Sequence, residues 1–135
     1  MAKSQNRAVA HFAVAALLVS VPISVLYVPI IGGAGWVVSA VALATASAAA
    51  AAWRVRAPLA DAKWEGQAGR AARLGVSIAV TADVGFSIVF GLLVGTIGPL
   101  PMADALAYGF FSGVFALLVL VPVGAVTGLI YEAGG

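Results

Sequence analysis

The chain has 135 residues, of which 63% are hydrophobic and only 9% are charged, and its mean hydropathy is +1.11. Because roughly a quarter of the residues in a soluble domain are charged, this composition excludes an ordinary water-soluble domain and predicts an all-α integral membrane protein. The net charge of +2 does not indicate nucleic acid as a partner, and the absence of cysteine excludes disulfides, thiolate metal sites and cysteine nucleophiles.

Four apolar stretches are each long enough to cross a bilayer as a helix, and we expect them to form a single membrane domain over residues 1–135. The predicted spans cover about 8–31, 36–53, 73–98 and 104–131, and a polar linker covers 54–72. Short turns within the first and second pairs of spans predict two antiparallel hairpins. The first apolar run is longer than the apolar region of a signal peptide, so we expect it to be retained as a span.

Prolines and glycines predict where the spans bend and end. Pro22 in the first span and Pro122 in the fourth each remove a backbone donor, which predicts a bend in either helix. Pro29 marks the predicted exit of the first span, and the pair Gly32 and Gly33 predicts a tight turn into the second. The chain is therefore expected to reverse its direction at this glycine pair.

Small residues recur at every fourth position of the second and third spans and form two Gly-x-x-x-Gly pairs in the fourth. Residues four apart form one ridge of a helix, and a ridge of small residues lets a neighbouring helix approach closely. The predicted packing residues are Ala40, Ala44, Ala48, Gly75, Ala79, Gly91, Gly95, Gly109, Gly113, Gly124 and Gly128. Alanine is also a good helix former, so a generic role for the alanine series stays open. So many ridges exceed what one compact bundle would use, which favours contacts with other membrane subunits or with further copies of this chain.

Asp83 interrupts the third span and is the candidate intramembrane polar site. The helical rise of about 1.5 Å per residue places it near the middle of a hydrocarbon core of about 30 Å. Insertion scales assign about 2.5 to 3.5 kcal/mol to an aspartate at this depth, so the carboxyl needs polar partners or a proton. The same span offers Ser87 and Thr81, and the first span offers Ser20 and Ser24. Apart from Arg73 at the start of the third span, none of the spans contains lysine or arginine.

Three interpretations of Asp83 remain open. The carboxyl makes a structural hydrogen bond between helices, contacts a basic residue of another subunit, or couples the protein to a proton or a cation. His11, the only histidine, is an interfacial residue, or it binds a metal or relays protons without a second ligand nearby in the sequence. The three interpretations of Asp83 are distinguished by which groups lie within hydrogen-bonding distance of its carboxyl group.

The polar linker carries most of the positive charge of the chain. Its predicted interfacial residues are Arg54, Arg56, Lys63, Trp64, Arg70 and Arg73. Pro58 is expected to open a short helix along the lipid headgroups. In this helix Trp64 and Ala68 share the face toward the membrane, and Lys63 points away from it. The linker is either an ordinary cytoplasmic loop or a docking surface for a partner or for anionic lipid.

The positions of the basic residues predict the orientation. All seven Lys/Arg lie on the N-terminal tail or close to the linker, whereas the two opposite turns contain none. Under the positive-inside rule, the N-terminus, the C-terminus and the linker are therefore all expected to be cytoplasmic.

The sequence predicts no enzyme, because it has no phosphate-binding glycine loop with a lysine and no carboxylate pair within one span. It also indicates no cofactor and no metal site. We expect a non-catalytic polytopic protein that packs through its Gly/Ala ridges as a structural or assembly subunit of a larger membrane complex or of a virion membrane. The alternative is a small proton- or cation-coupled transporter or channel, acting as a homo-oligomer, with Asp83 as the coupling carboxylate. Expected partners are membrane lipid, other membrane subunits or copies of itself, in a prokaryotic cytoplasmic membrane or a viral membrane.

Overall fold

The computed structural model describes residues 2–27 and 34–134, and these residues form only helices and the turns between them. The helices are α1 (Ala2–Tyr27), α2 (Ala34–Arg54), α3 (Arg56–Trp64), α4 (Ala68–Ile97) and α5 (Met102–Ala133). Helices α1, α2, α4 and α5 are each long and apolar enough to cross a membrane. The prediction of an all-α chain with four helices that are long and apolar enough to span a membrane is therefore confirmed.

The helices differ in length from the predicted spans. Helix α4 begins at Ala68 instead of about residue 73, because alanine and arginine favour helix and let it extend into the polar linker. Helix α5 has 32 residues and is thus about 48 Å long, which exceeds a hydrocarbon core of about 30 Å. Both α1 and α5 continue through their internal prolines, Pro22 and Pro122. The predicted exit of the first span at Pro29 and the turn at Gly32 and Gly33 lie outside the described residues.

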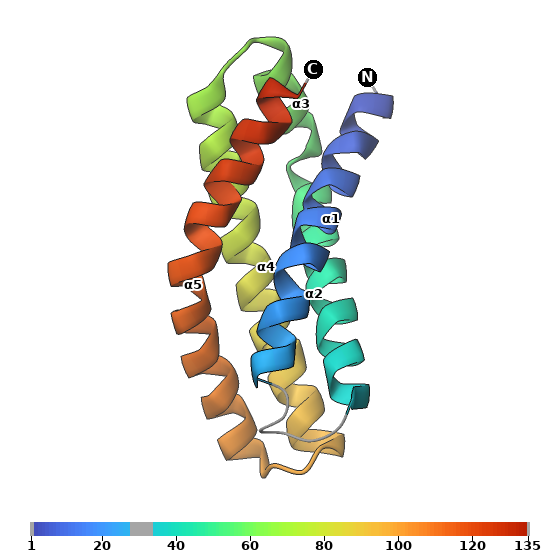
Figure 1. Ribbon diagram of the computed structural model, residues 1–135, viewed down its shortest axis with the longest axis vertical. Coiled ribbons are helices and arrows are strands. Elements are labelled where there is room, and N and C mark those ends of the chain that lie inside the picture. Colours follow the sequence, from blue (N-terminus) through green and yellow to red (C-terminus); the bar gives the residue numbers. More distant parts are fainter. Residues whose placement is uncertain (1, 28–33, 135) are drawn as a thin grey trace.

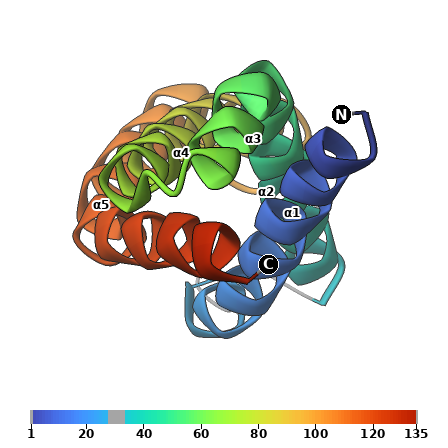
Figure 2. The ribbon, with the colours of Figure 1, turned by 90° about the horizontal axis from the view of Figure 1, so that it is seen from above.

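The four long helices run side by side along the long axis of the molecule (Figure 1). Helix α4 packs along α5, α1 packs along α2, and α2 contacts α4, whereas the contact between α1 and α5 is slight. In the view from above, α4 and α5 occupy one side of the bundle and α1 and α2 the other (Figure 2). The beginning of α1, the short helix α3 and the end of α5 gather at one end (Figure 1).

The buried apolar side chains form two separate clusters. The first contains Phe12, Leu59, Ile78 and Tyr131 together with small alanines, and it joins α1, α2, α3, α4 and α5. The second, built around Ala40, Phe90, Val94 and Ala105, joins α2, α4 and α5. Along α4, Asp83 lies between Ile78 of the first cluster and Phe90 of the second. The middle of the bundle therefore has a polar group where its two ends have an apolar core.

Helices α4 and α5 approach one another through glycine. A Cβ atom added at Gly124 would lie 2.8 Å from Cβ of Ala79 and 3.0 Å from the carbonyl carbon of Gly75. A Cβ atom at Gly128 would lie 2.8 Å from the carbonyl carbon of Ala71, and one at Gly109 would lie 2.9 Å from the carbonyl oxygen of Ser87. Backbone atoms cannot give way as a flexible side chain can, so these glycines set the distance between the two helices.

The linker folds differently from the prediction. Helix α3 ends at Trp64, and the N–H of Gly66 then donates to the carbonyl of Lys63 at 3.2 Å while the N–H of Gln67 donates to that of Ala62 at 2.8 Å. This pair of bonds is a Schellman motif, which places Gly66 in the left-handed region at φ +63°. Trp64 and Ala68 therefore belong to different helices, so the prediction of one helix carrying both on one face is wrong.

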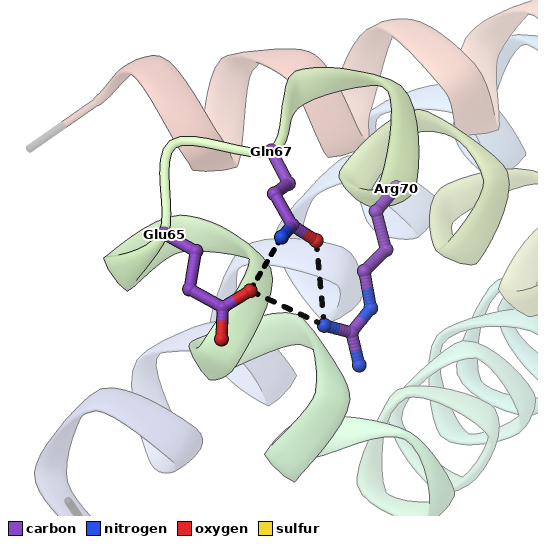
Figure 3. Close-up of polar contacts among 3 residues, drawn as sticks. All are labelled: Glu65, Gln67 and Arg70. Carbon is purple, nitrogen blue, oxygen red and sulfur yellow. Dashed lines mark hydrogen bonds and ion pairs between the residues drawn. The ribbon is translucent and has the colours of Figure 1, made fainter.

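The contacts around this turn are polar and lie at the surface. Gln67 donates through Nε2 to Oε2 of Glu65 at 2.5 Å, and Arg70 donates through Nη1 to Oε1 of Gln67 at 3.4 Å (Figure 3). Arg70 and Glu65 also form an ion pair with an N···O distance of 3.7 Å. Because both of these charged side chains are about half exposed, the pair adds little to stability.

Candidate functional site

Asp83 lies at the middle of α4 and is almost completely buried, with 7% of its surface exposed. The other buried polar residues in the described part of the chain are Ser20 and Ser24 on α1 and Thr127 on α5. Helices α1, α4 and α5 thus each contribute a buried polar side chain to the interior. Asp83 is the only one of the four that carries an ionisable group.

No hydrogen bond or ion pair joins the carboxyl group of Asp83 to another residue within 2–27 and 34–134. Two of the buried hydroxyls are already used within their own helices. Ser20 donates to the carbonyl of Leu17 at 3.2 Å, and Thr127 donates to that of Val123 at 2.6 Å. The expected structural hydrogen bond between Asp83 and another helix is therefore not formed in the described part of the molecule.

Two cavities lie against Asp83. The first has a volume of about 140 Å³ and reaches from Phe12 on α1 to Thr127 on α5, with Ala44 and Ala48 of α2 in its wall. The second has a volume of about 160 Å³ and is lined by side chains of α1, α2, α4 and α5. Five residues line both cavities: Ile23, Ser24, Asp83, Phe86 and Ala116. The carboxyl group therefore stands at the boundary between the two spaces.

Ser87 lies one turn along α4 from Asp83 and faces the same glycine of α5. A Cβ atom added at Gly113 would lie 3.3 Å from Cβ of Ser87 and 3.5 Å from Oδ2 of Asp83. Gly113 thus leaves the space that these two polar side chains occupy. Thr81, the third residue of the predicted polar site, lies on the exposed side of α4 and is not brought to the cavities.

The predicted packing residues are distributed between the helix contacts and the cavities. Ala40 and Ala48 are buried in α2, and Ala44 lines the first cavity. A Cβ atom at Gly91 would contact the backbone of Ala105, and one at Gly95 would meet the side chain of Met102. These contacts all lie within a single chain.

Two polar residues of α5 were not selected from the sequence, although both line the second cavity. They are Tyr108 and Ser112. Stepping along α5 in fours from Tyr108 gives Ser112, Ala116 and Leu120, and each of these residues lines one of the two cavities. The same four-residue step that identifies the ridge around Asp83 would therefore have found them.

Polar contacts also join α1, α3 and α5 at the end of the bundle where α3 lies. Tyr131 donates through its hydroxyl to the carbonyl of Ser4 at 3.1 Å, and Lys63 donates through Nζ to the carbonyl of Tyr131 at 2.9 Å. His11 holds Nε2 at 3.2 Å from the carbonyl of Thr127. Lys63 thus contacts α5, where it reaches a carbonyl at the C-terminal end of that helix.

The remaining interfacial residues lie around α3. Trp64 is 78% exposed, and Arg54, Arg70 and Arg73 are exposed as well. Arg56 stacks its guanidinium group on the ring of Trp53, at 3.9 Å from the ring centroid. Indole rings and basic groups at one end of a helical bundle are typical of the boundary between lipid and water.

No family model, no curated protein and no solved structure matches this chain. Among the described residues there is also no group of three or more His, Cys, Asp or Glu side chains that could hold a metal ion. The chemistry of the site therefore has to be argued from Asp83 and the two cavities beside it.

Proposed function

We propose that the helices form two antiparallel hairpins, α1 with α2 and α4 with α5, and that both termini and α3 are cytoplasmic. All seven Lys/Arg residues lie near the start of α1 or between Arg54 and Arg73. The start of α1, α3 and the end of α5 lie at one end of the molecule (Figure 1). This placement supports the proposal, because the positive-inside rule assigns that end to the cytoplasm.

We propose that the protein is a small proton- or cation-coupled transporter or channel, in which Asp83 is the coupling carboxylate. The observation that carries this proposal is a buried carboxyl group that has no partner in the described residues and lies against two cavities. A carboxyl in this position is free to exchange a proton or a cation, because no hydrogen bond or ion pair already holds it.

The other two interpretations of Asp83 explain less. A structural hydrogen bond between helices requires an acceptor or donor that the described part of the chain does not supply to it. A basic residue of another subunit would have to reach a side chain that is 7% exposed and covered by α1 and α5. Coupling to a proton or a cation needs only the cavities that are present.

The alternative of a structural or assembly subunit has weaker support. It was based on small-residue ridges in excess of what one bundle would use. The glycines of α4 and α5 contact one another within a single chain, so fewer of them are left to contact other subunits. Assembly with itself or with other membrane proteins stays a prediction.

Flux measurements on purified protein in liposomes test the proposed function. We expect the protein to carry protons or a monovalent cation down an imposed gradient, and Asp83→Asn to lower this flux at least tenfold, because the amide cannot exchange a proton. The matched control is Asp104→Asn, which makes the same chemical change at an exposed position on the first turn of α5.

The control variant is expected to retain the flux of the unchanged protein. Equal flux through Asp83→Asn and the unchanged protein would exclude Asp83 as the coupling group. An unchanged protein that carries no proton and no monovalent cation above the leak of empty liposomes would contradict the transporter or channel proposal.

A further inference from the structure

The first cavity beside Asp83 is mostly apolar, whereas the second is also lined by the hydroxyl-bearing residues Ser24, Ser87, Tyr108 and Ser112. In the first, the polar side chains besides Asp83 are Ser20, Ser24 and Thr127, and two of these three hydroxyls donate within their own helices. The remaining wall consists of alanine, valine, leucine, isoleucine, phenylalanine and glycine. A site with one carboxyl and an apolar wall suits a ligand that has one charge and an apolar body.

Such a wall does not suit a hard metal ion. Calcium takes six to eight oxygen ligands, and magnesium keeps several of its waters, so both need more oxygen atoms than one carboxylate supplies. No group of three or more metal-ligating side chains occurs among the residues that the structure describes. An organic cation differs, because it needs one opposite charge and is otherwise stabilised by apolar contacts.

The sizes of the cavities favour small ring-sized or branched groups. Each has a volume of about 140 to 160 Å³, which is close to the engineered cavity of about 150 Å³ that holds one benzene molecule in another protein. Because Asp83 lines both cavities, a charged nitrogen beside it could carry an apolar substituent into either one.

Aromatic rings also line the two cavities. Phe86 lines both cavities and stacks on Phe90 with ring centroids 5.1 Å apart. Phe12 lines the first cavity and Tyr108 the second. Aromatic faces attract organic cations, and the attraction is strongest where water is excluded. These rings therefore add recognition of positive charge to that of the carboxylate.

We propose that the site at Asp83 binds a monovalent organic cation, a lipophilic amine or quaternary ammonium, with its nitrogen beside the carboxylate and an apolar arm in one of the two cavities. This inference rests on the proposed function, because it names the cargo or ligand of the same carboxyl group. It adds that charge and apolar shape are both required for binding.

Titration calorimetry on the full chain in dodecylmaltoside tests the inference, with benzyltrimethylammonium as the probe. We expect saturable binding with one site per chain. Tetramethylammonium keeps the charge but lacks the ring, and neopentylbenzene keeps the shape but replaces the nitrogen by carbon. Each of these is expected to bind at least tenfold more weakly, and equal binding of either would overturn the inference.

Three variants locate the probe in the protein. Asp83→Asn is expected to weaken binding at least tenfold by removing the charge. Ala116 lines both cavities, so Ala116→Leu reduces the space in each while it retains the carboxyl group of Asp83. This variant should also weaken binding at least tenfold. Asp104→Asn should bind as the unchanged protein does. The helical circular dichroism and the elution volume of each variant establish that it is folded.

The outcomes separate this inference from the proposed function. If benzyltrimethylammonium fails to bind while ion flux still depends on Asp83, the proposal of an organic cation as ligand is wrong. The proposal that Asp83 is the coupling carboxylate is then retained. If binding is saturable but unchanged in both Asp83→Asn and Ala116→Leu, the probe binds elsewhere and the inference is overturned. If neither binding nor flux is found, both proposals fail.

Discussion

Asp83 places a carboxyl group inside the helical bundle without a hydrogen bond or ion pair to the described residues, although such a group is costly at the centre of a membrane-spanning helix. Insertion scales assign about 2.5 to 3.5 kcal/mol to an aspartate at the centre of a helix. A residue that stabilises the fold normally recovers this free energy through hydrogen bonds, and Asp83 forms none with the described residues. Asp83 is therefore expected to lower the stability of the bundle that holds it.

The variant Asp83→Leu is accordingly expected to raise the free energy of unfolding by about 1 to 3 kcal/mol, since it removes a polar group that no hydrogen bond to the described residues compensates. Unfolding in mixed micelles of sodium dodecyl sulfate and dodecylmaltoside, followed by circular dichroism, measures this change. Thr81→Val is the control, because it replaces a polar residue on the exposed side of the same helix and should shift stability by less than about 0.5 kcal/mol. A clear loss of stability in Asp83→Leu would instead show that Asp83 forms a stabilising hydrogen bond between helices.

At the scale of the helix, α4 and α5 form the most tightly joined pair of the bundle. Gly75 and Gly124 lie against one another, and Gly128 lies against the backbone of Ala71. This contact fixes the distance between α4 and α5, which form one side of the cavities. Alanine at these positions would push the helices apart, because the neighbouring atoms belong to the backbone.

We therefore expect Gly124→Ala to lower the free energy of unfolding by about 1 to 3 kcal/mol through overpacking. The matched control is Gly85→Ala on α4, where an added Cβ atom has no neighbour within 4 Å. This control should be neutral or stabilising by up to about 1 kcal/mol, because alanine favours helix more than glycine does. Unfolding in the same mixed micelles measures both variants, and equal effects would show that the close contact of Gly124 does not limit packing.

The sequence predicted the helices better than it predicted their ends. Four apolar stretches and the four-residue spacing around Asp83 are local patterns, and they gave the spans and the buried face of α4. The end of α3 depends on one left-handed residue, Gly66, whose conformation is set by bonds to Ala62 and Lys63. The absence of a partner for Asp83 depends on how four helices meet, which no local pattern contains.

At the scale of the whole molecule, the basic residues and the two chain ends share one end of the bundle. Trp64 and the exposed arginines lie around α3 there, beside the start of α1 and the end of α5 (Figure 1). The connection between α4 and α5, from Gly98 to Pro101, lies at the opposite end and carries no basic residue. This charge difference is what the proposed orientation rests on.

Single cysteines test the orientation directly, because the natural chain contains none. In intact bacterial cells, a membrane-impermeant maleimide is expected to label Ala103→Cys but not Asn6→Cys or Ala133→Cys. All three positions are exposed, so each should react after the membrane is permeabilised. Labelling of Asn6→Cys or Ala133→Cys in intact cells would contradict the cytoplasmic placement of the corresponding terminus.

The side-chain hydrogen bonds between α1 and α5 lie near one end of the bundle. His11 meets Thr127 and Ser4 meets Tyr131 near one end, whereas Ser24 lies about 20 Å farther along α1 than His11, at the wall of both cavities. Any tilt of α1 that keeps these two contacts moves Ser24 much farther than it moves His11. A tilt of this kind that carries Ser24 away from α4 and α5 would widen the space beside Asp83, whereas the contacts of His11 and Ser4 with α5 would be kept.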